Sequence, residues 1–144
     1  MIYSDTIELL KECNAGIKMG VASIDEVLDK VQDSKLKQLL STCKTEHQQL
    51  EGESHILLTE YGDSDKEPSP IAKGMSWIKT NVKLTIDESD KVIADLMTDG
   101  CNMGVKSLNK YLNQYNAAQE NAKNLVKRLI YLEEKLAVDI RPFL

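Results

Sequence analysis

The sequence predicts an all-α protein in which four long amphipathic helices pack as a bundle of two antiparallel helical hairpins. Apolar residues recur at helical spacing in four long segments, and no alternating strand pattern competes with them anywhere. The connection between the second and third segments is long enough to cross the bundle. At 144 residues the chain has the size of one average domain, so we expect a single domain over 1–144.

The composition argues against several classes of protein. Eighteen Lys and Arg against 23 Asp and Glu give a net charge of -5, which disfavours nucleic-acid and membrane-surface partners. No apolar run approaches the roughly 18 residues of a membrane span, and no secretory segment opens the chain. Three cysteines, an odd number, indicate reduced thiols. We therefore expect a soluble cytoplasmic protein.

The first hairpin is predicted over 4–61. Ser4 or Asp5 can cap its first helix, and Asp33 and Ser34 form a short turn to the second. The apolar seam of the first helix consists of Ile7, Leu10, Ile17, Val21, Ile24, Leu28 and Val31. That of the second consists of Leu36, Leu40, Cys43, His47, Leu50, Ser54, Leu57 and Tyr61. Gly62 then favours a left-handed helix end.

A crossover is predicted over 62–86, with a Pro-containing loop followed by a short helix at 71–82 that contains Trp77. The second hairpin is predicted over 87–141. Its first helix runs from the acidic residues at 87–90 to about residue 115, and its second ends before Pro142. The two seams contain Ile93, Leu96, Met103 and Leu108, and Ala118, Ala122, Leu125, Leu129, Leu132 and Leu136.

This order of elements resembles the ferritin-like superfamily. The likeness is closer to a small bacterial ferritin-like family of unknown function, particularly over MSWIKTNVKLTIDESDKVIADLMTDG at 75–100, where an aromatic crossover helix leads to an acidic turn and the third helix. The resemblance implies a ferritin-like four-helix bundle, and the family has no reaction to transfer.

Ferritin-like di-metal proteins use a Glu from each of two helices and a Glu-x-x-His pair from each of the others. This chain lacks that set. Glu8 and Glu12 point about 160 degrees away from the first seam, at 100 degrees per residue, and Asn14 points inward instead. A complete ferroxidase centre is therefore not expected, and no catalytic residues or cofactor are predicted.

A reduced site is the alternative. His47, Glu51, Asp99 and Glu133 fall near the middle of the bundle and are candidate ligands for a single cation, iron or zinc. The competing interpretation treats Asn14 and His47 as buried polar residues, with His47 hydrogen-bonded to Asn14 or to a neighbouring carboxylate.

Two G-x-x-x-G spacings, Gly16 with Gly20 and Gly100 with Gly104, suggest close helix contact or a locally loosened helix. Cys13, Cys43 and Cys101 lie on three helices without paired spacing and are interpreted as small core residues.

The preferred function is a non-catalytic interaction or structural role, as a homodimer or larger homo-oligomer with a possible protein partner. Metal binding is the runner-up, and an apolar small molecule held between the helices is a third class that leaves no motif. Five apolar residues near the termini are candidates either for an interface or for capping the bundle: Ile2, Tyr3, Ile140, Phe143 and Leu144.

Overall fold

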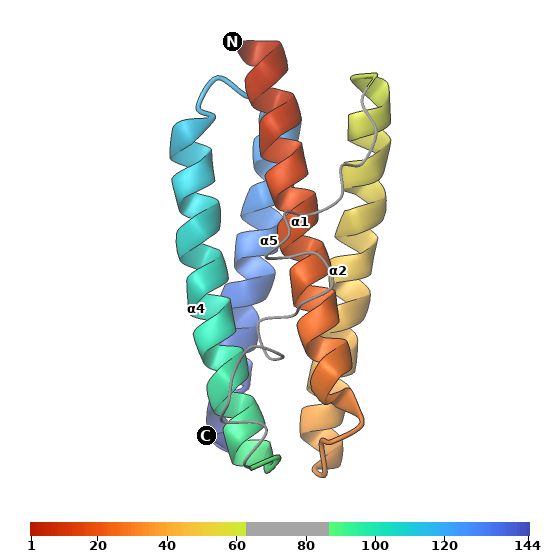
Figure 1. Cartoon of the computed structure of the whole chain (residues 1–144), viewed down its shortest axis with the longest axis vertical. Coiled ribbons are helices and arrows are strands. Elements are labelled where there is room, and N and C mark those ends of the chain that lie inside the picture. Colours follow the sequence, from red (N-terminus) through yellow and green to blue (C-terminus); the bar gives the residue numbers. More distant parts are fainter. Residues whose placement is uncertain (63–86) are drawn as a thin grey trace.

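A computed structural model describes residues 1–62 and 87–144, and over these residues the chain is helical and contains no strand (Figure 1). Four long helices pack against one another: α1 (Ile2–Leu28), α2 (Ser34–Glu60), α4 (Asp90–Gln114) and α5 (Glu120–Asp139). A short 3-10 helix, η2 (Arg141–Phe143), follows α5. The prediction of an all-α arrangement of four helices is confirmed. Most of the predicted crossover, with its helix at 71–82 and Trp77, lies outside the described residues.

Helices α1 and α2 lie side by side and are joined by the short connection at 29–33 (Figure 1). Asp33 caps the start of α2 by accepting hydrogen bonds from the backbone N–H groups of Lys35 and Leu36, at 2.7 and 3.0 Å. At the other end of the pair, the Tyr3 hydroxyl donates to the carbonyl oxygen of Tyr61. Gly62 follows with a φ of 73°, the left-handed conformation that the sequence predicts there.

Helix α4 begins beside the turn that connects α1 to α2. The Asp90 carboxylate accepts hydrogen bonds from the backbone N–H groups of Gln32 and Asp33, at 2.9 and 2.8 Å. Helices α2 and α4 therefore start at the same end of the bundle and run in the same direction (Figure 1). The sequence alone did not determine this relation.

The start of α1 differs from the prediction, because the helix begins at Ile2, before the expected caps. The Asp5 carboxylate instead accepts a hydrogen bond from the backbone N–H of Ala117, at 3.1 Å. The neighbouring Thr6 hydroxyl accepts one from the backbone N–H of Gln119, at 2.9 Å. These two side chains hold the α4–α5 connection against α1, a tertiary role that local capping rules do not predict.

The buried apolar side chains form two clusters, one toward each end of the bundle. The first includes Leu10, Cys13, Ile17, Leu50, Leu58, Leu108, Leu125 and Leu129. The second includes Ile24, Val27, Leu36, Leu40, Ile93, Leu96, Cys101, Leu136 and Ile140. On each helix the boundary between the clusters falls near a small or polar residue: Gly20, His47, Gly104 and Glu133.

The seam predicted for α5 is buried throughout, whereas the one predicted for α4 is partly wrong. Met103 is 50% exposed, while Cys101 is only 2% exposed. The closely buried stripe of α4 contains Ile93, Met97 and Cys101, spaced four residues apart, so Met103 lies to one side of it.

The terminal apolar residues divide between the two roles considered for them. Ile140 is fully buried and Phe143 packs against the second cluster, so both cover one end of the bundle. Ile2, Tyr3 and Leu144 are exposed, by 58, 58 and 50% respectively. None of the described helices is both long and apolar enough to cross a membrane.

Candidate functional site

A histidine and a glutamate from two helices meet at the boundary between the two apolar clusters. Nε2 of His47, on α2, lies 3.0 Å from Oε1 of Glu133, on α5. Nδ1 of the same imidazole lies 2.8 Å from the carbonyl oxygen of Cys43, one turn earlier on α2. The His47 side chain is 1% exposed and the Glu133 side chain 13%, so the pair is nearly removed from water.

Hydrogen-bond chemistry determines the charge of this pair. A carbonyl oxygen only accepts, so Nδ1 of His47 carries a proton and donates it to Cys43. Nε2 faces a carboxylate, and a proton there completes an imidazolium–carboxylate pair. Burial lowers the pKa of His47, but hydrogen bonds to Cys43 and Glu133 outweigh it and raise the pKa to about 10. The positive charge of His47 is therefore matched by Glu133.

The cysteines of the described residues are buried packing groups, not exposed nucleophiles. Burial raises the pKa of the Cys101 thiol, and the nearby Glu133 carboxylate adds to that rise. Sγ of Cys43 lies 3.5 Å from Nδ1 of His47. Cys13 is fully buried, and desolvation raises its pKa to about 12. All three thiols are free and buried, as expected of small core residues.

Glycine leaves the space that the imidazole occupies. A Cβ atom built at Gly20 on α1 would lie 3.0 Å from both Cδ2 and Nε2 of His47. A Cβ at Gly104 on α4 would lie 3.6 Å from the Glu133 carboxyl group, an ordinary contact, and one at Gly100 would meet nothing within 4 Å. The glycines at 20 and 104 thus make room for the side chains of His47 and Glu133, and Gly100 borders open space.

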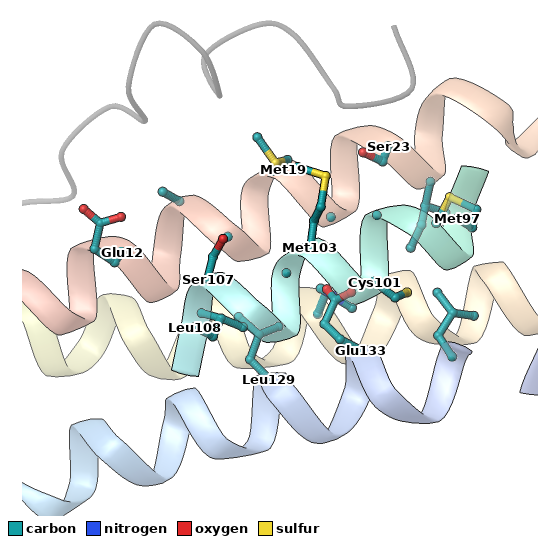
Figure 2. Close-up of a pocket in the computed structure, with 18 of the residues that line it drawn as sticks. Glu12, Met19, Ser23, Met97, Cys101, Met103, Ser107, Leu108, Leu129 and Glu133 are labelled. Carbon is teal, nitrogen blue, oxygen red and sulfur yellow. The ribbon is translucent and has the colours of Figure 1, made fainter. Parts of the chain in front are cut away.

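A cavity of about 250 Å³ lies between α1 and α4, and both His47 and Glu133 contribute to its lining (Figure 2). Its lining is largely apolar and includes Ile24, Leu96, Met97, Leu108, Leu129 and Leu136, together with the four glycines of the two spacings. Figure 2 shows the side chains of Met19 and Met103 reaching toward each other across it. Because Met103 and Ser107 line the cavity and are also exposed, the cavity reaches the protein surface.

The cavity lining also includes Glu12, a carboxylate whose position in the sequence predicts a different orientation. Glu12 is predicted to point away from the seam of the first helix, yet it lines the cavity and is half-buried. Tyr111 of α4 also lines the cavity, and burial and the Glu12 carboxylate both raise the pKa of the Tyr111 phenol. The difference arises because α1 packs against α2, α4 and α5, so it has more than one inward side.

The structure brings together only part of the predicted metal-ligand set. His47 and Glu133 are paired, but Asp99 is exposed on α4 and Glu51 is half-exposed one turn beyond His47 on α2. Within 1–62 and 87–144, no group of three or more His, Cys, Asp or Glu side chains is arranged to hold a metal. Binding of iron or zinc stays a prediction.

Asn14, the other predicted buried polar residue, is 1% exposed. It does not bond to His47, which uses the carboxylate of Glu133 instead. Among the described residues, Oδ1 of Asn14 and Oγ of Ser54 have no hydrogen-bond partner.

Comparison with known proteins does not add to this geometry. No protein-family model matches the chain, and neither the curated proteins nor the solved structures contain a match. Residues 1–62 and 87–144 therefore define the class: four packed helices with a buried His–Glu pair beside an apolar cavity.

Proposed function

We propose that this chain is a non-catalytic binding protein that holds a small apolar molecule in the cavity between α1 and α4. The observation that carries the proposal is the cavity itself, about 250 Å³ with a largely apolar lining. An apolar cavity of about 150 Å³ suffices to bind benzene, so this one suits a molecule of about ten non-hydrogen atoms. Binding sites for small molecules commonly combine such a lining with a few placed polar groups.

The state of the polar groups around the cavity supports binding rather than catalysis. Both ring nitrogens of His47 are engaged, Nδ1 with the Cys43 carbonyl and Nε2 with Glu133. The buried thiol of Cys101 has a raised pKa and is therefore a poor nucleophile. In this proposal the His–Glu pair keeps the helices in register and closes the base of the cavity.

The proposed arrangement is ferritin-like, with two antiparallel hairpins joined by a crossover. The contact of Tyr3 with Tyr61 and the bonds from Gln32 and Asp33 to Asp90 support it, because α2 ends and α4 begins at opposite ends of the bundle. Assembly as a homo-oligomer is part of the same proposal. Exposed Ile2, Tyr3 and Leu144 are its candidate contacts.

The test is binding of 1-octanol to the full chain, measured by calorimetry and by NMR titration. We expect saturable binding of one molecule per chain. Gly100→Leu should weaken it at least tenfold, because position 100 lines the cavity and a side chain there meets open space. Gly52→Leu is the matched control, since Gly52 also has nothing within 4 Å but lies outside the cavity. Absent binding, or equal effects of the two variants, would overturn the proposal.

A further inference from the structure

The charged groups of the cavity indicate which polar end a ligand carries, provided that the cavity binds a ligand as proposed above. Of the described lining residues, Glu12, Glu133 and His47 are the Asp, Glu or His side chains, and none is Lys or Arg. His47 and Glu133 lie 3.0 Å apart and compensate each other's charge. Glu12 has no cationic partner among the other described lining residues, so the lining carries an excess negative charge.

The surroundings of Glu12 preserve that charge. The Tyr111 hydroxyl interacts with the Glu12 carboxylate but neutralises none of its charge, because phenols are uncharged at neutral pH. Two further acids lie earlier on α1, each beside a cation: Asp5 is 3.7 Å from the N-terminal ammonium and Glu8 is 3.9 Å from Nζ of Lys11. The excess negative charge of the lining therefore comes from Glu12 itself, and a carboxylate there favours cations and disfavours anions.

Other lining groups suit a cation with an apolar body. The Tyr111 ring offers an aromatic face for a cation–π contact, and the thioethers of Met19 and Met103 can adapt to ligands of different shape. A ligand carboxylate would instead lose its hydration beside Glu12 or Glu133 with no positive group of the described lining to replace it.

We infer that the cavity selects an amphipathic organic cation, an apolar body of about ten non-hydrogen atoms ending in a protonated amine that is placed against Glu12. The apolar body lies between the glycine spacings of α1 and α4, and the ammonium group is nearest Glu12 and Tyr111. Molecules of the same length that end in a carboxylate are excluded.

The experiment compares three probes of equal chain length: octylammonium, 1-octanol and octanoate. Each is titrated against the full chain at pH 7.5, where an alkylamine is protonated and a carboxylic acid ionised. We expect octylammonium to bind at least tenfold more tightly than 1-octanol, and octanoate at least tenfold more weakly. Added salt should reduce the difference in affinity between each charged probe and 1-octanol, because salt screens the interaction with Glu12.

Variants separate the cavity from the acidic surface. Glu12→Gln keeps the size and polarity of the side chain but removes its charge, so it should abolish the preference for octylammonium over 1-octanol. Glu8→Gln is the matched control, because the Glu8 side chain is 47% exposed and lies outside the lining. Gly100→Leu should weaken octylammonium as it weakens 1-octanol, which surface binding would not show.

The outcomes distinguish this inference from the proposed function. Binding of 1-octanol without a preference for octylammonium, or with tighter octanoate, would refute the cationic ligand and leave the binding role standing. A preference that persists in Glu12→Gln would also refute the assignment to that carboxylate. Failure of all three probes to bind would refute the proposed function itself.

Discussion

Two walls of the same cavity are packed very differently. At the first, which we call the packed wall, Gly20 of α1 meets the imidazole of His47, and a Cβ would approach it to 3.0 Å. At the second, the open wall, a Cβ on Gly100 of α4 would meet nothing within 4 Å. The same residue type therefore provides room for a buried ion pair at one wall and leaves space for a ligand at the other. Substitutions at the two walls should have opposite effects on stability.

The largest effect should come from breaking the pair at the packed wall. Glu133→Ala leaves the buried His47 without its counter-charge, and removal of one partner from a buried ion pair costs about 3–5 kcal/mol. The exposed neighbour Glu134 provides the control, since Glu134→Ala should change stability by no more than about 0.5 kcal/mol. Urea unfolding monitored by circular dichroism measures both. Equal losses in the two variants would show that the pair contributes nothing specific.

The pH dependence of stability tests the charge of the same pair. The pKa of folded His47 is raised from 6.5 to about 10, with Cys43, Glu133 and Cys101 as its polar neighbours. Because the pKa of His47 is higher in the folded than in the unfolded state, its charge stabilises the fold fully below about pH 6.5. This stabilisation is lost as the pH rises toward the folded-state pKa.

The free energy of unfolding should therefore fall by up to about 1.4 kcal/mol per pH unit between about pH 6.5 and 8.5. This range lies below the pH at which most thiols of the unfolded chain lose their protons. His47→Gln retains hydrogen-bonding capacity but not the titration, so its stability should change much less over that range. Urea unfolding at three pH values compares the two proteins. Parallel pH profiles would contradict the imidazolium assignment.

Gly20→Ala should destabilise the protein even though alanine is the better helix former. Crowding against the imidazole costs about 1–3 kcal/mol, whereas the gain in helix propensity is about 1 kcal/mol. At Gly104 the nearest atoms of Glu133 would lie 3.6 Å from the new methyl group, so Gly104→Ala should be stabilising. Thermal unfolding ranks the two variants, and the reverse order would mean that His47 moves aside freely.

The smallest effect belongs to the open wall. Gly100→Ala adds a methyl group to open space within α4, so the protein should become more stable by about 0.5–1 kcal/mol. Gly52→Ala on α2 should give a similar gain, because its surroundings are equally open. A loss at Gly100 alone would indicate that the wall is closed in solution.

Regular patterns in the sequence were sufficient where one face of a helix decides burial. The seam of α5 is confirmed from Ala118 to Leu136, and Gly62 has the expected left-handed conformation. Helices with more than one inward side were less predictable. Met103 is exposed at the cavity and Glu12 lines it, because α4 and α1 each have a side that faces the space between them.

In the candidate site, too, periodicity predicted burial but not the contact between helices. Burial of His47 follows from its position in the apolar seam of α2, and Glu133 was considered at the edge of the α5 seam. Their direct pairing required the relative height and rotation of two helices whose pairing residues are 86 positions apart in sequence. The paired glycine spacings were the one signal of the cavity, but spacing alone does not distinguish close helix contact from open space.

By itself, the sequence determined the helical class, the approximate positions of the described helices and most of the buried stripe of each, because these depend on local periodicity. Only the tertiary structure decided that α2 and α4 run in the same direction, that His47 meets Glu133 and that a cavity separates α1 from α4. These features depend on how several helices fill a shared volume. Periodicity states which side of a helix is apolar, but not how closely another helix approaches it.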